Sequence, residues 1–238
     1  MLRIIPAALV CISITTLLSA CNEKSASTAA VKLDNQTNKA SYSIGVQMGS
    51  QMAPLKDSLN QDALIMGFRD TMSGKESQLT AEDMQAAIQA FQKTMMEAEQ
   101  AKQQAIATAN AAEGEKYLAE NKTKEGVTVT ESGLQYKVLK EGTGASPAAT
   151  DTVVTHYSGT LINGKVFDSS YKRDAPATFP VNGVIKGWTE ALQLMKVGAK
   201  WQLFIPSALA YGERGAGKDI GPNQVLIFEI ELLEIKKP

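Results

Sequence analysis

The spacing of the apolar residues changes near Gly126, and this change limits the chain to a small set of folds. In residues 80–98 the apolar positions recur every three or four residues, and no proline interrupts them. This period is typical of a helix with one buried side. After Gly126 apolar and polar residues alternate, as in strands that bury one face. We therefore expect an α+β chain, with a helical domain at residues 37–125 and a sheet domain at residues 126–238.

The helical domain divides into two short helices and one long helix. Residues 39–52 and 60–72 fit the short helices, and Ser73-Gly74 ends the second. The long helix begins at Thr80, whose hydroxyl can accept a free N–H of the first turn. It runs to about Asn121, because its second half is rich in alanine, and its roughly 42 residues would span ~60 Å. The first half carries an apolar seam for a helical partner: Met84, Ile88, Phe91, Met95 and Ala98.

The helical domain is too small to bury its own apolar residues, so we expect it to pair with a second copy. Methionines are frequent between Met48 and Met96, and their adaptable side chains suit a packed interface. The alternative is that the helices fold back on the sheet domain. That return would need a loop that the long alanine-rich stretch lacks. The expected assembly is a homodimer.

The first twenty residues indicate a secretory signal. Arg3 precedes an apolar run from Ile4 to Ala20, which is the arrangement of a charged start and an apolar middle. A membrane-spanning anchor is the alternative. However, a run of seventeen residues that contains a proline and several hydroxyls is marginal for the ~30 Å apolar layer. We expect residues 1–20 to be removed.

Cys21 is expected to carry a lipid. Leu18-Ser19-Ala20-Cys21 resembles the bacterial lipobox, in which the signal is cleaved before a cysteine that is then acylated. Cys11 lies within the signal, so Cys21 would be the sole thiol of the mature chain, and no disulfide could form within it. An ordinary signal beside a chance cysteine is the alternative.

Several acyl chains anchor a protein stably to a membrane. Asn22 follows the cysteine where an aspartate would resemble an inner-membrane signal. We therefore expect attachment to the outer membrane, facing the periplasm or the cell surface. Residues 21–36, rich in small and polar residues, would form a flexible tether.

Composition excludes several classes of function. The formal net charge is −1, and the sequence has no basic face to bind nucleic acid. His156 is the single histidine, so neither a histidine-rich metal site nor a Ser-His-Asp triad can be built. We expect no metal and no cofactor, and we assign His156 a structural role.

The strands of the sheet domain direct aromatic side chains inward. Alternation over residues 152–161 places Tyr157 on the buried face, where its hydroxyl needs a partner. The last strand places Phe228 inward by the same pattern. Turn residues between Ile162 and Lys165 close a hairpin that leads to Phe167. Trp201 shares a strand face with apolar neighbours, which favours the core.

Asp168 interrupts these apolar residues with a charge. A buried carboxylate must be paired or hydrogen-bonded, and Tyr157 and Arg173 are the candidate partners. The alternative is that Asp168 caps a local turn through Ser169 and Ser170.

A loop with four glycines, residues 212–222, follows Tyr211. We expect a mobile flap over a pocket, with Tyr211 at one hinge and Ile220 packed inward. A phosphate-binding loop is the alternative, but its Lys-Ser/Thr ending and the helix after it are missing.

Five motifs of the sheet domain occur in the order and spacing of the FKBP family. They are His156-Tyr157-Ser158-Gly159, Phe167-Asp168-Ser169-Ser170, Val184-Ile185-Lys186-Gly187-Trp188, Ala210-Tyr211-Gly212 and the strand from Ile227 to Leu232. Linked motifs in order are more specific than one short pattern. The stretch from Ala40 to Gly45, with the helix after it, resembles the amino-terminal module of the macrophage infectivity potentiator (Mip) subgroup. The resemblance covers the chain after about residue 33.

The resemblance implies a fold and an activity. The fold would be a twisted antiparallel sheet around one short helix, after an all-α dimerisation module with a long connecting helix. The activity would be peptidyl-prolyl cis-trans isomerisation in envelope proteins, together with chaperone activity. The clients would be proline-containing unfolded or folding polypeptides, and the macrolides tacrolimus and rapamycin would be inhibitors. Such rotation needs no cofactor, because the barrier of ~18–20 kcal/mol comes from the double-bond character of the C–N link and no bond has to be made.

By this resemblance the site would contain two groups of residues. The catalytic group would be Tyr157, Phe167, Asp168, Trp188, Tyr211 and Phe228. The substrate-binding group would be Val184, Ile185, Arg173 and Ile220.

One residue departs from the family pattern, and one rival function is considered. Many family members carry an aromatic residue after a Lys-Pro or similar pair, whereas this chain has Ala177 after Pro176, which we expect to open one side of the pocket. The rival function is a non-catalytic module that grips proline-containing segments as a holdase or adhesin. The presence of Asp168, Trp188 and Tyr211 together favours the enzyme.

Overall fold

The computed structural model describes residues 31–237, so the expected signal, Cys21 and the first part of the tether lie outside the described residues. The chain divides into two units, one that ends at Gln78 and one that starts at Leu79. Within the described range, no helix is both long and apolar enough to cross a membrane. The expected α+β class, with helices first and an antiparallel sheet after them, is confirmed.

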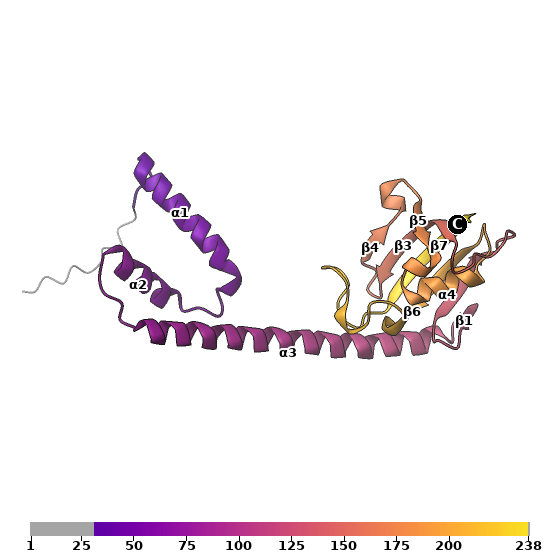
Figure 1. The fold of residues 1–238 in the computed structure, drawn as a ribbon, viewed down its shortest axis with the longest axis horizontal. Coiled ribbons are helices and arrows are strands. Elements are labelled where there is room, and N and C mark those ends of the chain that lie inside the picture. The colour runs from indigo at the N-terminus through magenta and orange to yellow at the C-terminus, as the bar shows by residue number, and fades with distance from the viewer. Residues whose placement is uncertain (1–30, 238) are drawn as a thin grey trace, which may run out of the picture. The chain divides into compact units, whose positions relative to one another are not determined.

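The first unit consists of helices (Figure 1). α1 spans Gln36–Met52 and is followed by a short 3-10 turn, Ala53–Leu55, and α2 spans Gln61–Met72. Asn35 and Asn60 cap α1 and α2, because each side-chain oxygen accepts the backbone N–H three residues on. Neither helix contains a buried residue. Their exposed apolar side chains include Tyr42, Ile44, Val46, Leu64, Ile65 and Phe68.

The second unit begins with the long helix α3, which spans Ala81–Asn121. Thr80 caps its start, since its Oγ1 accepts the Asp83 N–H at 3.0 Å. Both ends agree with the limits expected from the sequence.

The second half of α3 packs against the sheet, a contact that its alanine-rich sequence did not indicate. Ala107, Gly114 and Asn121 are buried. Asn121 Nδ2 donates to Gln135 Oε1 at 3.0 Å, and Gln135 Nε2 donates to the Leu118 carbonyl of the helix at 2.9 Å. A Cβ at Gly114 would lie 2.8 Å from Val225 Cγ2. Small residues therefore give α3 a face that docks closely, and this half of the helix does not stand free.

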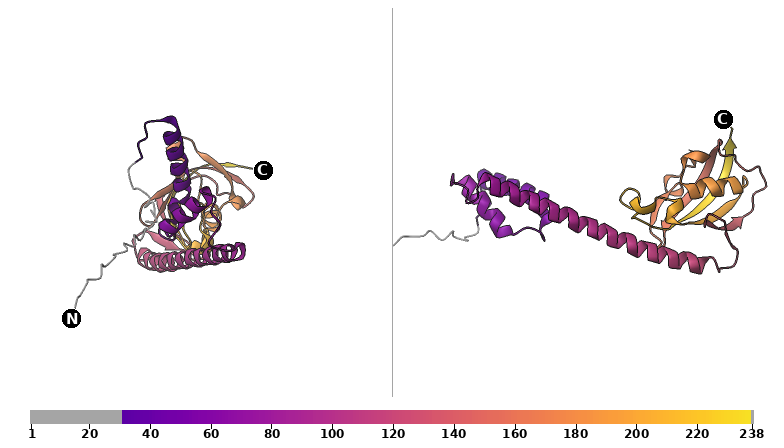
Figure 2. Two further views of the ribbon diagram at one scale, coloured as in Figure 1. Left: turned by 90° about the vertical axis from the view of Figure 1, so that its left-hand side faces the viewer. Right: turned by 60° about the horizontal axis from the view of Figure 1, so that its bottom comes forward.

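The sheet is antiparallel throughout, with the strand order β1-β2-β6-β7-β3-β4 and with β5 paired to β3. Its strands are β1 (Val127–Val129), β2 (Gln135–Lys140), β3 (Thr152–Leu161), β4 (Val166–Ser169), β5 (Ala177–Pro180), β6 (Lys200–Ile205) and β7 (Leu226–Lys236). The helix α4 (Lys186–Leu194) lies across this sheet (Figures 1 and 2). The arrangement is the expected sheet around one short helix.

The core lies between the sheet and α4. The expected inward faces are confirmed, since Tyr157 on β3 and Phe228 on β7 are both 5% exposed. Trp188 from α4 joins them in the same cluster. Trp201 on β6 stacks on Tyr136 with ring centroids 4.2 Å apart and belongs to the core, as expected.

Candidate active site

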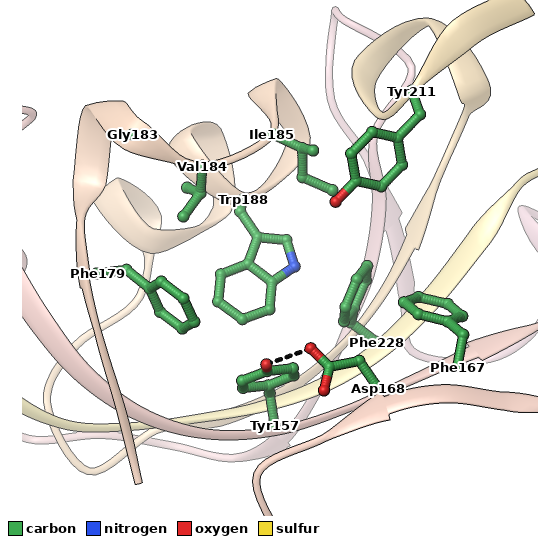
Figure 3. A pocket seen from close by; sticks show the side chains of 10 residues that line it. All are labelled: Tyr157, Phe167, Asp168, Phe179, Gly183, Val184, Ile185, Trp188, Tyr211 and Phe228. Atoms are coloured by element: carbon green, nitrogen blue, oxygen red, sulfur yellow. Dashed lines mark hydrogen bonds between the residues drawn. The ribbon is translucent and has the colours of Figure 1, made fainter. Parts of the chain in front are cut away.

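A cavity of about 400 Å³ opens beside the start of α4, between strands β3, β4, β5 and β7 and the loop after β6 (Figure 3). Its size falls in the range of small-molecule sites. All ten residues expected at the site, except Arg173 and Ile220, line it. The lining consists of Tyr157, Phe167, Asp168, Phe179, Gly183, Val184, Ile185, Trp188, Tyr211 and Phe228.

Trp188 stands at the centre of the aromatic group. Its ring meets those of Tyr157, Phe179 and Phe228 nearly at right angles, with centroids 5.2, 5.6 and 5.2 Å apart. Phe167 meets Phe228 in the same way at 5.4 Å. Edge-to-face contacts are favourable because the positive edge of one ring meets the negative face of the next. Each ring thus holds its neighbours, and the apolar wall is fixed before any ligand binds.

Trp188 owes its position to the close approach of α4 to the sheet. A Cβ at Gly187 would lie 2.5 Å from Ile205 Cγ2 on β6, so a larger residue there would push the helix away. Thr189 Oγ1 donates to the Val181 carbonyl at 2.7 Å and ties the helix start to the preceding turn. Trp188 is consequently only 4% exposed.

A charged group lies among the aromatic residues. The Tyr157 hydroxyl donates to Asp168 Oδ2 at 2.5 Å, which is the bond drawn in Figure 3. Arg173 Nη2 donates to the Tyr157 hydroxyl at 2.8 Å, and Arg173 Nη1 pairs with Asp168 Oδ1. Both partners suggested by the sequence therefore contact the carboxylate.

These contacts separate the protonation states of Asp168 and Tyr157. Burial raises the pKa of Asp168, but hydrogen bonds from Tyr157 and Arg173 and the charge of Arg173 outweigh it, so this pKa lies below its usual value. The Ser169 backbone N–H contributes least to the lowering, and the Ser170 N–H donates to the Tyr157 carbonyl and not to Asp168. Burial, with the hydrogen bond to Asp168, raises the pKa of Tyr157. Asp168 is thus ionised and Tyr157 protonated at neutral pH.

Ser170 fixes the segment that carries Asp168 and Arg173. It is fully buried. Its Oγ accepts the Tyr157 N–H at 2.8 Å, and its own N–H donates to the Tyr157 carbonyl at 2.9 Å. His156 Nδ1 lies 3.0 Å from the same Oγ. The His156 ring stacks on the exposed Tyr171, which does not line the cavity.

Arg173 and Ile220 take part without lining the cavity. The Arg173 guanidinium lies 5.7 Å from the centroid of the Tyr157 ring and reaches the network from the rim. Ile220 is half-buried and packs against the core from the loop of residues 212–222.

Phe179 is the lining residue that sequence reasoning missed. An open side is expected at Ala177, but Phe179, two residues further along β5, supplies an aromatic wall from the same strand. Side chains two apart point to the same face of a strand, and Ala177 and Phe179 are both half-buried. That alternation was the available signal.

The loop of residues 212–222 closes on itself beside the cavity. Ala216 and Ile220 form an isolated antiparallel bridge, and Gly215, just before it, has φ +64°. A Cβ at Gly215 would lie 2.2 Å from the Ile220 carbonyl oxygen. Strand β7 follows, where a phosphate loop requires a helix. Among residues 31–237, no group of His, Cys, Asp and Glu is arranged to hold a metal ion.

Known proteins resemble the chain along most of its length. Residues 144–233 match the family described as FKBP-type peptidyl-prolyl cis-trans isomerase, and residues 37–138 match the domain amino terminal to it. The outer membrane protein MIP of Legionella longbeachae is 44% identical over 236 residues, which are 99% of this chain and 98% of that protein. The FKBP-type 22 kDa peptidyl-prolyl cis-trans isomerase of Escherichia coli is 50% identical over 83% of this chain and 94% of its own. The crystal structure of FkpA from Escherichia coli has a TM-score of 0.75 at 39% identity, and the match covers 86% of this chain and 99% of that one.

Proposed function

The chain belongs to the FKBP-type peptidyl-prolyl cis-trans isomerases, in the Mip-like group, and we propose that the aromatic cavity is the place where it rotates X-Pro bonds. The observation that carries this proposal is a wall of five interlocked aromatic rings around a single hydrogen-bonded carboxylate. The family implies proline-containing peptides as substrates. Because the family is one of peptidyl-prolyl isomerases, we favour catalysis over the purely non-catalytic alternative.

The cavity would accelerate rotation by excluding water. The barrier of ~18–20 kcal/mol reflects the resonance of the planar amide. Twisting removes that resonance and with it part of the amide's polarity, so the planar form loses more than the twisted form when water is removed. Only interactions that favour the twisted form raise the rate, and an apolar wall fixed in advance meets that condition.

We assign the lining residues separate tasks. Trp188 forms the floor on which the proline ring rests, while Phe167, Tyr211 and Phe228 close the sides. The first N–H groups of a helix lack partners within it, so the Ile185 N–H at the cap of α4 donates to a substrate carbonyl, and Val184 contributes to the same wall. Asp168 orients the Tyr157 hydroxyl and, with Arg173, forms the polar rim. None of these residues acts as a general base.

A matched pair of tryptophans tests this assignment. Trp188 and Trp201 are both buried, and neither indole N–H has a hydrogen-bond partner among the described residues. Each Trp→Phe substitution therefore removes the same group from a similar environment, but only Trp188 lines the cavity. The assay is protease-coupled cis-to-trans isomerisation of a short X-Pro peptide by the chain lacking residues 1–21.

We expect Trp188→Phe to lower kcat/KM and Trp201→Phe to leave it unchanged, with Asp168→Ala and Phe228→Ala also impaired and the wild type blocked by rapamycin. Full activity of both Trp188→Phe and Phe228→Ala would remove the cavity from the mechanism.

We further propose that residues 37–125 form a dimerisation domain. Ile44 is 57% exposed and Phe68 is 49% exposed, and helices as short as α1 and α2 are marginal in water without packing of an apolar face. Sedimentation equilibrium should give a dimer for the chain lacking residues 1–21. Phe68→Glu should give a monomer, whereas Ser58→Glu, which adds the same charge in the loop before α2, should not. A wild-type monomer would contradict the proposal.

The place of action that we propose is the outer membrane, with Cys21 lipidated and the catalytic domain in the periplasm or at the cell surface. The lipobox-like Leu18-Ser19-Ala20-Cys21 supports this, and a relative 44% identical bears the name outer membrane protein. Chaperone activity towards unfolded envelope proteins stays a prediction. It is measured as slower aggregation of a denatured, proline-free client, which isomerisation cannot affect.

A further inference from the structure

The loop of residues 212–222, which we call the flap, is joined to helix α3. Asn110 Nδ2 donates to the Pro222 carbonyl at 2.7 Å, and Asn223 Nδ2 donates to the Ala107 carbonyl at 3.3 Å. One turn of α3 and the end of the flap thus each donate a side-chain hydrogen bond to a backbone carbonyl of the other. Figures 1 and 2 show the flap reaching the helix just before β7 begins.

The two segments are shaped for this contact. Ala107 is only 8% exposed, and a Cβ at Gly221 would lie 3.3 Å from Asn110 Nδ2, so the flap approaches the helix without a side chain between them. Asn223 has φ +57°, a left-handed conformation that asparagine tolerates better than most residues. That conformation directs its amide back to the helix.

The same junction continues to the cavity. The Asn223 N–H donates to the Gly212 carbonyl at 2.8 Å and closes the base of the flap. Gly212 follows Tyr211, whose ring points into the cavity in Figure 3. Tyr211 is 42% exposed, so few packing contacts hold its side chain, and the backbone that carries it ends at the closed base of the flap.

A second link holds the far end of the flap, but it is weaker. Lys165 pairs with Asp219 at 2.7 Å, and both side chains are more than half exposed. Water and salt screen such surface pairs, which contribute little. The flap is therefore held by its contact with α3 and by the packing of Ile220 against the core.

We infer that Asn110 is a positioning residue for prolyl isomerisation, which acts through the flap to hold Tyr211 at the cavity. The inference rests on the proposed role of the cavity. It gives α3 a task beyond joining the two units, because the second half of the helix becomes part of the working isomerase. Asn223 is the second residue of the same link.

The first test measures the flap itself and does not depend on activity. In the chain lacking residues 1–21, amide hydrogen exchange at Asn223 should become about fivefold faster in Asn110→Ala, the effect of one neutral hydrogen bond. Asn223→Gly still permits the left-handed backbone, removes the side chain with its amide, and should also speed exchange at this position. Thr108→Ala is the control, since the Thr108 hydroxyl bonds only to the carbonyl of Gln104 in its own helix, and it should change nothing. Unchanged exchange in Asn110→Ala would overturn the inference.

The second test is a double-mutant cycle on kcat/KM for an X-Pro peptide. Asn110→Ala should lower kcat/KM by up to about fivefold in the wild-type background and should cause no further loss in Tyr211→Ala. Equal losses in both backgrounds would show that Asn110 acts on the fold in general, and would also overturn the inference. If Trp188→Phe retained full activity, the cavity assignment would fail, while the exchange result would still decide whether α3 holds the flap.

Discussion

Replacing Gly159 by alanine should lower kcat/KM, because it displaces aromatic rings of the cavity without replacing any residue that lines it. Gly159 on β3 lies opposite Phe228 on β7. A Cβ at this position would lie 2.6 Å from Phe167 Cζ and 2.7 Å from Phe228 Cε1. Carbon atoms normally approach to ~3.5–4.0 Å, so both rings must move by about 1 Å. Because Gly159 shares the inward face of β3 with Tyr157, the rings move toward the cavity.

The size of the effect follows from this displacement. Overpacking of this kind destabilises a domain by ~1–3 kcal/mol, which leaves most domains folded at room temperature. A misplacement of ~1 Å in a catalytic constellation can reduce the rate up to about a hundredfold. We therefore expect Gly159→Ala to remain folded, with kcat/KM reduced between about tenfold and about a hundredfold and with weaker rapamycin binding.

Two measurements check the reasoning: the protease-coupled assay, and circular dichroism to confirm the fold. Gly67→Ala in α2 is the control, because a Cβ there meets nothing within 4 Å, and its kinetics should match the wild type. If Gly159→Ala kept both its kcat/KM and its rapamycin affinity, the positions of Phe167 and Phe228 would not matter for turnover.

Three further outcomes are expected. First, kcat/KM should be constant between about pH 5 and 8. The reason is that the pKa of Asp168 is lowered from near 3.9 and the pKa of Tyr157 is raised from near 10. An inflection near neutral pH would reveal a titrating catalytic group. Ionised Asp168 stabilises the fold above its unfolded pKa, and acid denaturation should show this contribution lost as the pH falls through its lower folded pKa. Second, Tyr157→Phe should raise the pKa of Asp168, followed by NMR titration, and lower kcat/KM about fivefold; an unshifted carboxyl would contradict the network. Third, Cys21→Ser should move the protein from the membrane pellet to the soluble fraction, and a variant that still sediments would exclude lipid as the anchor.

Much of the sheet could be predicted because its strands bury one face. The alternation along β3 and β7 predicts that Tyr157 and Phe228 face inward, and both side chains are buried. Asp168 stood out for a related reason, since a charge in an apolar stretch requires partners. Both suggested partners, Tyr157 and Arg173, contact it.

The missed features depend on contacts between distant segments. An alanine-rich helix has the same pattern whether it stands free or docks through its small residues, so the packing of Ala107 and Gly114 had no distinct signal. Phe179 was not predicted, because the expected open side rested on Ala177 alone, although both side chains share one face of β5. Ile220 packs inward as expected but against the core and not at the cavity, a distinction that only the three-dimensional path of the flap decides.

An enzyme that rotates the X-Pro bond by excluding water transfers no proton in its slow step. Comparison of kcat/KM in H₂O and D₂O for wild-type chain lacking residues 1–21, with a short X-Pro peptide, tests this directly. We expect equal rates in the two solvents at every pH between about 5 and 8, since Asp168 stays ionised and Tyr157 stays protonated across that range. A clearly slower reaction in D₂O would mean that a proton moves in the transition state, as in general acid–base catalysis, and would contradict the mechanism.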